Sequence, residues 1–380
     1  MTGLLVMVPT AFVLAGLVAL WRTRRRTSGS GTMPMTVLKP LCGTDPNLEA
    51  NLRSFFEQTH PRFELVFGVQ GADDPSLAVV KALRDRHPNV RCRIVVHGGG
   101  RGVNPKVDNL RAMLPVASHD LLVISDSNVR VHPGYLEELA AEFDEDTGVV
   151  SSLFYLRETP TVGAVLESFS LAGDIAPSVA LTTSLGHPIV VGKSMAFRRQ
   201  TFEALGGFSA VANVLAEDYV IGRMFHEAGY RIVVCPTPVE NVAGPLTVQG
   251  FFRRHLRWNM IRLRLQPMAW FLEPLSRPVF VACGLLLVGA DPLVSVLWAL
   301  GLIAVRDGGA SLLLRGDIPT LLHAAAWIPF GILRDVVLLA AWVRAPFHRH
   351  VTWRGHRVRV SAGTRLYANR PAPETAAVEV

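Results

Sequence analysis

The chain has 380 residues, of which 18% are charged, and its mean hydropathy is +0.30. Because a water-soluble protein usually carries about 25% charged residues, this composition predicts membrane-embedded segments beside a large soluble part. The net charge is +7, but the arginine clusters flank apolar runs instead of forming a basic stripe, which argues against a nucleic-acid-binding protein. The cysteines are isolated, which excludes a disulfide scaffold or a zinc finger; they are Cys42, Cys92, Cys235 and Cys283.

The first predicted element is a membrane anchor at residues 1–26. Leu4–Trp21 is an uncharged apolar run that is just long enough for one bilayer span. Arg22 and Arg24–Arg26 come after this run, whereas a secretory signal would carry its positive charges in front of it. The positive-inside rule therefore predicts an N-terminus outside the cell and a cytoplasmic location for the chain after Arg26. A Ser/Gly-rich linker, residues 27–34, comes next.

Residues 35–245 predict a cytoplasmic α/β domain with a Rossmann-like, mainly parallel sheet. Short β-rich runs alternate with polar helical stretches, which is the pattern of strands joined by crossover helices. In such sheets ligands bind beyond the carboxyl ends of the strands, where several acidic residues of this chain lie. The clearest predicted strands are Thr36–Lys39, Phe63–Val69, Arg93–Val96 and Leu121–Ser125.

Three predicted helices of this domain share one kind of start. Asp45-Pro46, Asp74-Pro75 and Asn104-Pro105 each put a capping side chain ahead of a proline. Proline suits the first helical position because its missing N–H has no partner there in any helix. We therefore expect a helix to begin at each of these prolines.

Two further helical segments have an apolar character. Thr161–Leu185 is long and weakly polar, so it is either a core helix or an apolar flap at the membrane face. Residues 246–275 combine phenylalanines and tryptophans with arginines, which is typical of amphipathic helices at a membrane surface.

Residues 276–345 are predicted to form the C-terminal membrane helices. Pro278–Val305 as one helix would be about 42 Å long, which exceeds the hydrocarbon core of about 30 Å. We therefore expect a break at Asp291-Pro292 that gives two short passes. Ile318–Val343 is another apolar tract, and its adjacent charges Arg334-Asp335 can be tolerated where they face protein.

The tail comprises residues 346–380. Its arginines continue to Arg359, which favours the cytoplasmic side. The number of passes before it stays open, and so does the side on which it emerges. Residues 362–380 are expected to be disordered.

Acidic residues come directly after two of the predicted strands. Asp126-Ser127-Asn128 offers a carboxylate and a second oxygen two residues later, which can hold one hard cation such as Mg²⁺ or Mn²⁺. Such a cation neutralises a diphosphate leaving group. The alternative is an Asx-turn at the strand end. Asp73 and Asp74 carry the same ambiguity, since Asp74 also serves as a helix cap.

Two more groups of side chains can take part in chemistry. Glu217 and Asp218 open a predicted helix, where a carboxylate is either a cap or a general base. Arg254 and Arg257 lie three residues apart on one helical face and can grip phosphate oxygens, and Trp258 can stack on a sugar. The alternative for this group is a basic helix that lies on the membrane surface.

Gly192-Lys193-Ser194 ends like a phosphate-binding P-loop. The motif also requires a glycine five residues before Gly192, and His187 stands there. We therefore assign no phosphate-binding loop to this segment.

The order of these motifs resembles the ceramide glucosyltransferases (glycosyltransferase family 21), a membrane-bound branch of the inverting GT-A glycosyltransferases. The resemblance covers about 320 residues, including the anchor. The matching stretches begin at Leu38 (LKPLCGTDPNL), Val69 (VQGADDP), Gly102 (GVNPKVDNL), Ser125 (SDSNVRV), Ala216 (AEDY), Arg254 (RHLRW) and Trp353 (WRG).

The resemblance implies a GT-A fold and assigns roles on the donor side. Asp74, with Asp73 beside it, would contact the nucleotide of a UDP-sugar. Asp126 would hold a divalent metal on the diphosphate, and Lys106 would lie near the nucleotide. The metal motif is Asp-Ser-Asn instead of the commoner Asp-x-Asp, so the second metal ligand stays open.

The resemblance also assigns the acceptor side. Asp218 would be the general base that deprotonates the primary hydroxyl of ceramide, and inversion would convert the α-linked glucose of UDP-glucose into a β-glycoside. Arg254, Arg257 and Trp258 would close over the diphosphate and the acceptor. The product would stay in the bilayer, since the acceptor is a membrane lipid.

Three alternatives stay open at this point. The segment from Gly173 to Ser178 matches the acceptor region of the family poorly, so the acceptor can be a hopanoid that receives N-acetylglucosamine. A processive polysaccharide synthase uses the same scaffold but usually needs more membrane helices. A non-catalytic membrane scaffold or transport subunit predicts more polar residues inside the spans than Asp291 and the pair Arg334-Asp335.

Overall fold

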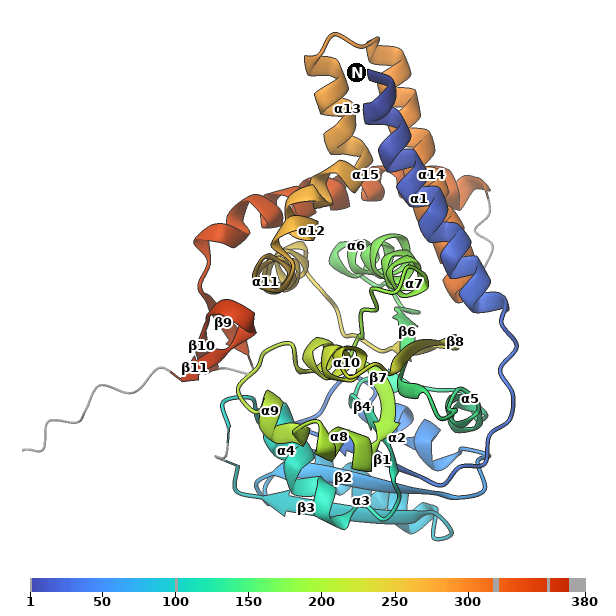
Figure 1. Ribbon diagram of the computed structural model, residues 1–380, viewed down its shortest axis with the longest axis vertical. Coiled ribbons are helices and arrows are strands. Elements are labelled where there is room, and N and C mark those ends of the chain that lie inside the picture. Colours follow the sequence, from blue (N-terminus) through green and yellow to red (C-terminus); the bar gives the residue numbers. More distant parts are fainter. Residues whose placement is uncertain (1, 100–101, 317–320, 354–355, 369–380) are drawn as a thin grey trace, which may run out of the picture.

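The computed structural model describes residues 2–99, 102–316, 321–353 and 356–368 (Figure 1). Its eight-stranded sheet has the order β3-β2-β1-β4-β7-β6-β8-β5. Strands β3, β2, β1 and β4 run parallel, as do β6 and β8, whereas β7 and β5 are antiparallel to their neighbours. The predicted mainly parallel α/β sheet is therefore confirmed. The strands are β1 (Met35–Pro40), β2 (Phe63–Gln70), β3 (Arg91–His97), β4 (Leu121–Ser125), β5 (Val129–Arg130), β6 (Thr147–Tyr155), β7 (Ser194–Arg198) and β8 (Arg231–Asn241).

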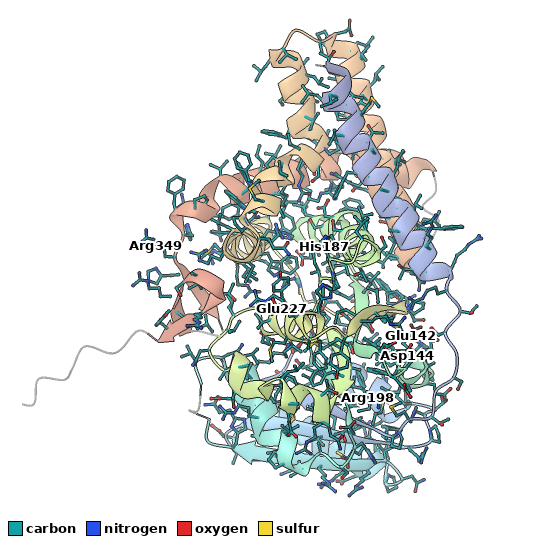
Figure 2. The ribbon with its side chains drawn as sticks, viewed as in Figure 1. Glu142, Asp144, His187, Arg198, Glu227 and Arg349 are labelled. Atoms are coloured by element: carbon teal, nitrogen blue, oxygen red, sulfur yellow. The ribbon has the colours of Figure 1, made fainter. Side chains whose placement is uncertain are left out.

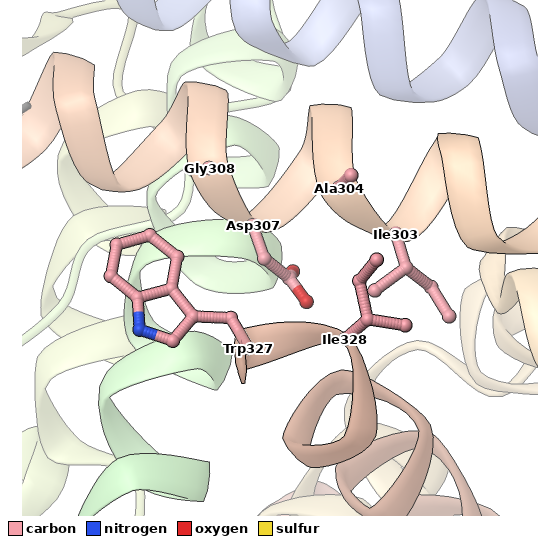
Figure 3. Close-up of a pocket in the computed structure, with 6 residues that line it drawn as sticks. All are labelled: Ile303, Ala304, Asp307, Gly308, Trp327 and Ile328. Carbon is pink, nitrogen blue, oxygen red and sulfur yellow. The ribbon is translucent and has the colours of Figure 1, made fainter. Parts of the chain in front are cut away.

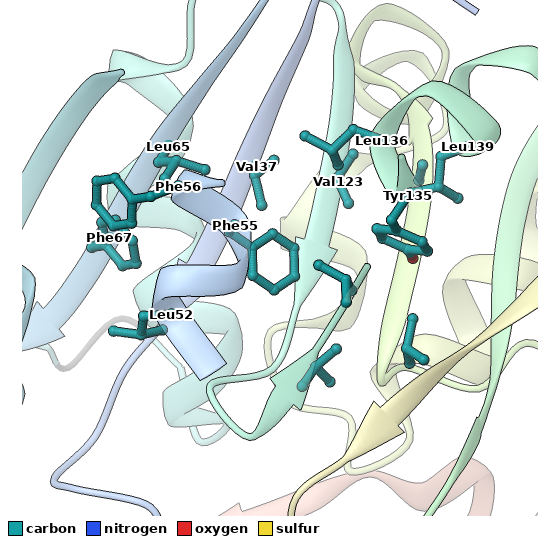
Figure 4. Packing of buried hydrophobic residues seen from close by; sticks show 14 of the residues in the cluster. Val37, Leu52, Phe55, Phe56, Leu65, Phe67, Val123, Tyr135, Leu136 and Leu139 are labelled. Carbon is teal, nitrogen blue, oxygen red and sulfur yellow. The ribbon is translucent and has the colours of Figure 1, made fainter. Parts of the chain in front are cut away.

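Helices cover both faces of this sheet, which is why its parallel strands are continuous apolar runs. On one face, Phe55 of α2 and Leu136 of α5 pack near Val37 and Val123 of the strands (Figure 4). The other face lies against α4 and α10, with Phe225 at its centre. The helices of this domain are α2 (Leu48–Phe56), α3 (Ser76–Arg86), α4 (Pro105–Met113), η1 (Leu114–Val116), α5 (Tyr135–Ala141), α8 (Arg199–Ala204), α9 (Gly207–Val211) and α10 (Glu217–Glu227).

Of the three predicted helix starts, the one at Asn104-Pro105 is confirmed, whereas α3 begins at Ser76, one residue after the predicted Pro75. The side chain of Asn104 accepts hydrogen bonds from the first turn of α4, and Asp74 does the same for α3. The start at Asp45-Pro46 is wrong, because α2 begins at Leu48. Asp45 instead accepts a hydrogen bond from the hydroxyl of Ser127, which draws its side chain across the sheet edge and away from the helix.

Apolar helices project from one end of the molecule, opposite the sheet (Figure 1). They are α1 (Thr2–Arg25), α13 (Pro278–Leu287) and α14 (Pro292–Arg315), with α15 (Leu321–Arg344) packed against α13 and α14. By length and composition, α1 and α14 are each sufficient to cross a membrane. The predicted break at Asp291-Pro292 is confirmed, since the carboxylate of Asp291 caps α14 by accepting from Val294 N (2.9 Å). The second piece is not short, however: α14 has 24 residues and passes the expected end at Val305.

The arginines at the end of α1 fasten it to the rest of the chain. Arg24 donates through Nε to the carbonyl of Leu313 in α14 (3.0 Å). Arg26 pairs with Glu142 (2.6 Å), which lies on the flank of the α/β domain (Figure 2), and donates to the carbonyl of Val234 (3.0 Å). These arginines therefore help to hold α1 in place against α14 and the α/β domain. Their positive charge also favours a cytoplasmic location for this end of α1.

The segment predicted as a core helix or a flap is one continuous helical stretch. It consists of α6 (Val162–Ser170), the π-helical η2 (Leu171–Ile175) and α7 (Ala176–Ser184). It packs against α1, α11, α14 and α15, and most of it is buried. The structure therefore supports the core helix, placed between the α/β domain and the apolar helices (Figure 1).

The expected amphipathic helices are α11 (Val248–Leu265), α12 (Pro267–Leu272) and η3 (Glu273–Ser276). Helix α11 packs between α6 and α15, and it buries Phe251 and Leu256. Large exposed apolar side chains lie on α12 and η3 instead, and α13 bends away from these elements by 73°. The apolar surface is therefore carried by the short α12–η3 segment; its exposed side chains are Met268, Phe271, Leu272 and Leu275.

The tail folds back onto the α/β domain. It contains η4 (Ala345–Phe347), β9 (His350–Trp353), β10 (His356–Val360), η5 (Ala362–Thr364) and β11 (Leu366–Ala368). The expectation of disorder from Ala362 is wrong up to Ala368, because β11 pairs with β10 and the Leu215 N–H donates to the Thr364 carbonyl (3.0 Å). Residues 369–380 lie outside the described residues, as do Arg354 and Gly355 of the WRG stretch.

Candidate active site

Asp126 lies directly beyond the carboxyl end of β4, at the edge where parallel α/β sheets bind ligands. Lys39 holds the backbone of Asp126, because its ammonium donates to the Asp126 carbonyl (2.7 Å) and to the Ser125 hydroxyl (3.2 Å). Lys39 is fully buried over the ring of Phe55, and burial lowers its pKa well below the ordinary value. The strand end is therefore a rigid platform for the Asp126 side chain.

The two oxygens of Asp126 are shared between two lysines. Oδ1 lies 3.0 Å from the ammonium of Lys106 at the start of α4, and Oδ2 lies 3.0 Å from that of Lys193. Lys193 also donates to Asn128 Oδ1 (2.9 Å). Burial alone would raise the pKa of Asp126, but the two ammonium groups hold it well below its usual range. Asp126 is therefore a firmly ionised carboxylate between two cations.

Asp218 is held at the first turn of α10 by two backbone donors. Its Oδ2 accepts from Gly192 N (2.6 Å), and its Oδ1 accepts from Tyr219 N (2.8 Å). A Cβ on Gly192 would lie 2.6 Å from that of Asp218, so only glycine allows this approach. Burial and the neighbouring charge of Glu217 raise the pKa of Asp218 to about 6, which suits a general base near neutral pH.

Lys106 connects Asp218 and its neighbour to Asp126. Its ammonium lies 2.9 Å from Glu217 Oε1 as well as 3.0 Å from Asp126 Oδ1. Burial opposes the charge on Lys106, but Asp126 and Glu217 outweigh it and hold the pKa above the ordinary value. Three strand and helix ends thus converge on one small cluster of charges.

Asp73 and Asp74 lie on the loop after β2. Asp74 accepts from Gly43 N (2.9 Å) in the loop after β1, besides accepting from Ser76 N (2.9 Å) at the start of α3. The same loop contains Asp45, which accepts from Ser127 next to Asp126. Asp74 is thus connected to the Asp126 region through the β1 loop, whereas the side chain of Asp73 is exposed to solvent.

On α11, the three predicted residues have different surroundings. Arg254 is paired with the buried Glu167 of α6 (2.9 Å), and Trp258 packs edge-on against His255. Burial would raise the pKa of Glu167, but His255 and Arg254 lower it to about 2. The guanidinium of Arg257 makes no hydrogen bond or ion pair within the described part of the chain, and burial together with Arg254 lowers its pKa. Arg257 is therefore the arginine of this pair that is available to an anion.

The chemistry of these side chains is compatible with a divalent metal at Asp126. Asp126 and Asn128 supply hard oxygen donors that already surround an ammonium ion at 2.9–3.0 Å. Among the described residues, no group of three or more His, Cys, Asp or Glu side chains is arranged to hold a metal. A metal bound here would therefore need further oxygens from a ligand such as a diphosphate.

Sequence patterns did not point to Lys193, Gly192 or Glu217 as partners of the predicted residues. The segment from Gly192 fails as a P-loop, yet it contacts both Asp218 and Asp126. Its position results from the antiparallel pairing of β7 with β4, which puts Ser194 opposite Ser125. That pairing leaves no local pattern in the sequence.

Comparisons with known proteins bear on the family and on the fold of the chain. Residues 1–366 match the family described as Glycosyl transferase family 21. The chain is 28% identical over 267 residues to ceramide glucosyltransferase 1 of Caenorhabditis elegans, covering 70% of this chain and 57% of that protein. It is 24% identical over 298 residues to the ceramide glucosyltransferase of Komagataella phaffii, covering 63% of this chain and 58% of that one. The matches thus span somewhat more than half the length of these relatives.

Among solved structures, a mannosyltransferase from Pyrobaculum calidifontis in complex with GDP-Man and Mn²⁺ superimposes with a TM-score of 0.51. The sequence identity is 21%, and the match covers 91% of this chain and 99% of that one. At this identity the likeness concerns the fold, which agrees with the GT-A architecture expected from the sequence.

Proposed function

The chain belongs to glycosyl transferase family 21, and we propose that it transfers glucose from UDP-glucose to the primary hydroxyl of ceramide with inversion at the anomeric carbon. The observation that carries this proposal is the carboxylate of Asp218. It has a pKa of about 6 and is oriented by Gly192 beside the cluster of Lys106 and Asp126.

In this mechanism Asp218 takes the proton of the acceptor hydroxyl. The hydroxyl oxygen bonds to the anomeric carbon as the bond to UDP breaks on the opposite face, and UDP leaves with the electron pair. Two backbone N–H groups fix the carboxylate, so it needs no reorganisation before it accepts the proton. Its raised pKa makes it a stronger base than an exposed aspartate while leaving it mostly ionised at pH 7.

The donor would bind at the carboxyl edge of the sheet. Asp73 and Asp74 would contact the nucleotide, and Lys106 would lie beside the diphosphate. Asp126, with Asn128, would hold a divalent metal, Mg²⁺ or Mn²⁺, which when bound neutralises the charge that develops on the leaving UDP.

Between donor and acceptor, Arg257 has a half-buried guanidinium that makes no hydrogen bond or ion pair among the described residues, so it is suited to a phosphate oxygen of the donor. Arg254 and Trp258 would complete this wall of the site. Arg254 would act while paired with Glu167, so the contribution of its charge to the diphosphate is smaller than that of Arg257.

The acceptor would be reached from a membrane surface. Helices α1 and α14 are long and apolar enough to cross a bilayer, and the exposed side chains of α12–η3 would rest in its interfacial layer. The arginines after Trp21 favour a cytoplasmic location for the α/β domain. The lipid headgroup then needs only to rise to the surface to meet Asp218.

The test is a UDP-release assay on the detergent-purified protein. UDP-glucose and UDP-N-acetylglucosamine are each combined with ceramide or a hopanoid, with and without Mn²⁺ or Mg²⁺. We expect release from UDP-glucose that requires ceramide and is lost in Asp218→Asn, while Asp85→Asn, an exposed carboxylate on α3, serves as the matched control.

Other outcomes assign the failure to one part of the proposal. Release only with UDP-N-acetylglucosamine and the hopanoid retains the mechanism and replaces both substrates. Full activity in Asp218→Asn rejects the base. Absence of release with every pair rejects the proposed activity.

A further inference from the structure

Lys193 contacts both side chains to which the proposed function assigns a divalent cation. Its ammonium lies 3.0 Å from Asp126 Oδ2 and 2.9 Å from Asn128 Oδ1. Carboxylate and amide oxygens of this kind are the ligands that hard metal ions prefer. Lys193 and a metal therefore compete for the same ligands, and both cannot use them at once.

The two lysines on Asp126 are not equivalent. Lys106 is held by a second carboxylate, Glu217, and its side chain is 17% exposed. Within the described part of the chain, the ammonium of Lys193 bonds only to Asp126 and Asn128, and its side chain is 23% exposed. A lysine has a flexible four-carbon stem and a compact charge, so Lys193 can turn away at little cost while Lys106 stays.

We propose that Lys193 is an exchangeable cation that occupies the Asp126–Asn128 oxygen pair and moves to the diphosphate of the sugar nucleotide when a divalent metal takes these oxygens. This inference rests on the proposed function for the identity of the anion. It makes Lys193 a positioning residue that couples the binding of metal to that of nucleotide.

The coupling is a consequence of the charges. Metal binding alone has to displace an ammonium ion from a carboxylate and leave it without an anion. When the diphosphate is present, the displaced ammonium gains a new partner, so nucleotide strengthens metal binding. By linkage, metal must strengthen nucleotide binding by the same factor.

The experiment measures Mn²⁺ binding to the full chain in detergent, from the electron paramagnetic resonance signal of free Mn²⁺, with and without UDP. In Lys193→Met we expect the affinity for Mn²⁺ without UDP to rise about tenfold, because a cation within a few ångströms of the ligand carboxylate is removed. The enhancement of Mn²⁺ binding by UDP should shrink by a similar factor. Lys193→Gln is a second neutral variant with the same expectation.

Two controls isolate the charge. Lys193→Arg keeps the positive charge and should retain the low Mn²⁺ affinity of the unsubstituted protein. Lys81→Met makes the same change at an exposed position on α3 and should leave both affinities unchanged. Thermal unfolding of each variant verifies that it is folded.

Unchanged or weaker Mn²⁺ binding in the folded neutral variants overturns the proposal. So does the absence of Mn²⁺ binding in every variant, because no competition then exists. These readouts do not depend on sugar transfer: failure of the proposed function appears as absent UDP release in the unsubstituted protein, whatever the Mn²⁺ titrations give.

Discussion

The chain gathers charge in two places, and these differ in how completely the charges satisfy one another. The first, the site cluster, lies at the edge of the sheet. The second, the helix cluster, lies where the apolar helices meet α6–η2–α7. The site cluster consists of Lys106, Asp126, Lys193, Glu217 and Asp218. The helix cluster consists of Asp174, Arg277, Arg306, Asp307, Arg334 and Asp335.

The helix cluster contains three arginines and three aspartates, and Arg277 extends it through Glu273 (2.9 Å) to Arg262, which lies 3.0 Å from Glu273, so positive and negative charges balance. Arg334 of α15 is fully buried and contacts Asp307 of α14 (2.8 Å) and Asp335 (3.0 Å). Arg306 completes a ring by pairing with the same two aspartates, at 2.9 and 3.1 Å. Figure 3 shows Asp307 on α14 facing α15, in a small pocket that it forms with Trp327 and other side chains. Every arginine of the cluster thus has at least two carboxylates within reach.

The site cluster is more open. The side chains of Asp126 and Lys193 are 25% and 23% exposed, and Arg257, close enough to Glu217 to feel its charge, makes no hydrogen bond or ion pair within the described residues. Burial and the like charge of Glu217 raise the pKa of Asp218, and Lys106 offsets this shift only in part. A neutral, enclosed network holds helices together, whereas an open one with unbalanced charge is suited to receiving a ligand.

The largest effect that distinguishes the two clusters is expected from Arg334→Met. It leaves Asp307 and Asp335 buried with too little positive charge, and breaking a buried pair in this way costs about 3–5 kcal/mol. Thermal unfolding in detergent should show a large loss of stability. Arg223→Met on the surface of α10 is the control, and equal melting of the two variants would contradict a structural role for the cluster.

In contrast to Arg334→Met, Asp218→Asn should cause a large loss of activity and little loss of stability. Activity should fall by about 10²–10⁴, because the general base is lost. Stability should change little: the folded-state pKa lies above the unfolded one, so ionisation of Asp218 costs stability as the pH rises from 3.8 to about 6, and the amide removes that cost while losing one of the two hydrogen bonds from backbone N–H groups. Activity assays and thermal unfolding on one preparation test both parts, and a strongly destabilised variant would make Asp218 a structural residue.

Because the helices pack closely around the helix cluster, Gly331→Ala should lower the stability of the protein, but by less than Arg334→Met. A Cβ there would lie 2.5 Å from Ile303 Cγ2 and 2.8 Å from Asp307 Oδ2, and such overpacking costs about 1–3 kcal/mol. Gly308→Ala on α14 is a matched control, since no described atom outside its own helical turn lies within 4 Å of a Cβ at that position. Comparable unfolding temperatures for the two variants would show that the cluster adapts to the added methyl group.

The smallest expected effect is the change of kcat/KM with pH. Since Asp218 acts in its deprotonated form and has a pKa of about 6, kcat/KM should fall about twofold between pH 7 and pH 6 and about tenfold per unit well below it. The residual activity of Asp218→Asn should lack this acidic limb. If the activity of that variant still fell in the same way at acidic pH, the titrating group would be a residue other than Asp218.

Much of the architecture can be predicted from local sequence patterns. The predicted strand Leu121–Ser125 has the bounds that the structure shows, because an apolar run of that length between turn residues has few other folds. The cap at Asn104 and the break at Asp291-Pro292 are predictable for a similar reason, since both depend on residues next to one another. The candidate residues Asp126 and Asp218 can be named from their places at a strand end and a helix start.

The tertiary structure alone decided which charges meet. Lys193 reaches Asp126 across 67 residues, and Arg254 reaches Glu167 across 87, so no local spacing reveals either pair. An apolar tract is expected to end at Val305 because Arg306 and Asp307 are costly inside a span. The helix continues because α15 supplies Arg334 and Asp335 as partners, and these contacts exist only once the helices have packed. Local sequence patterns thus determined where many helices and strands form. Long-range pairing of charges determined how the site is assembled and how far α14 extends.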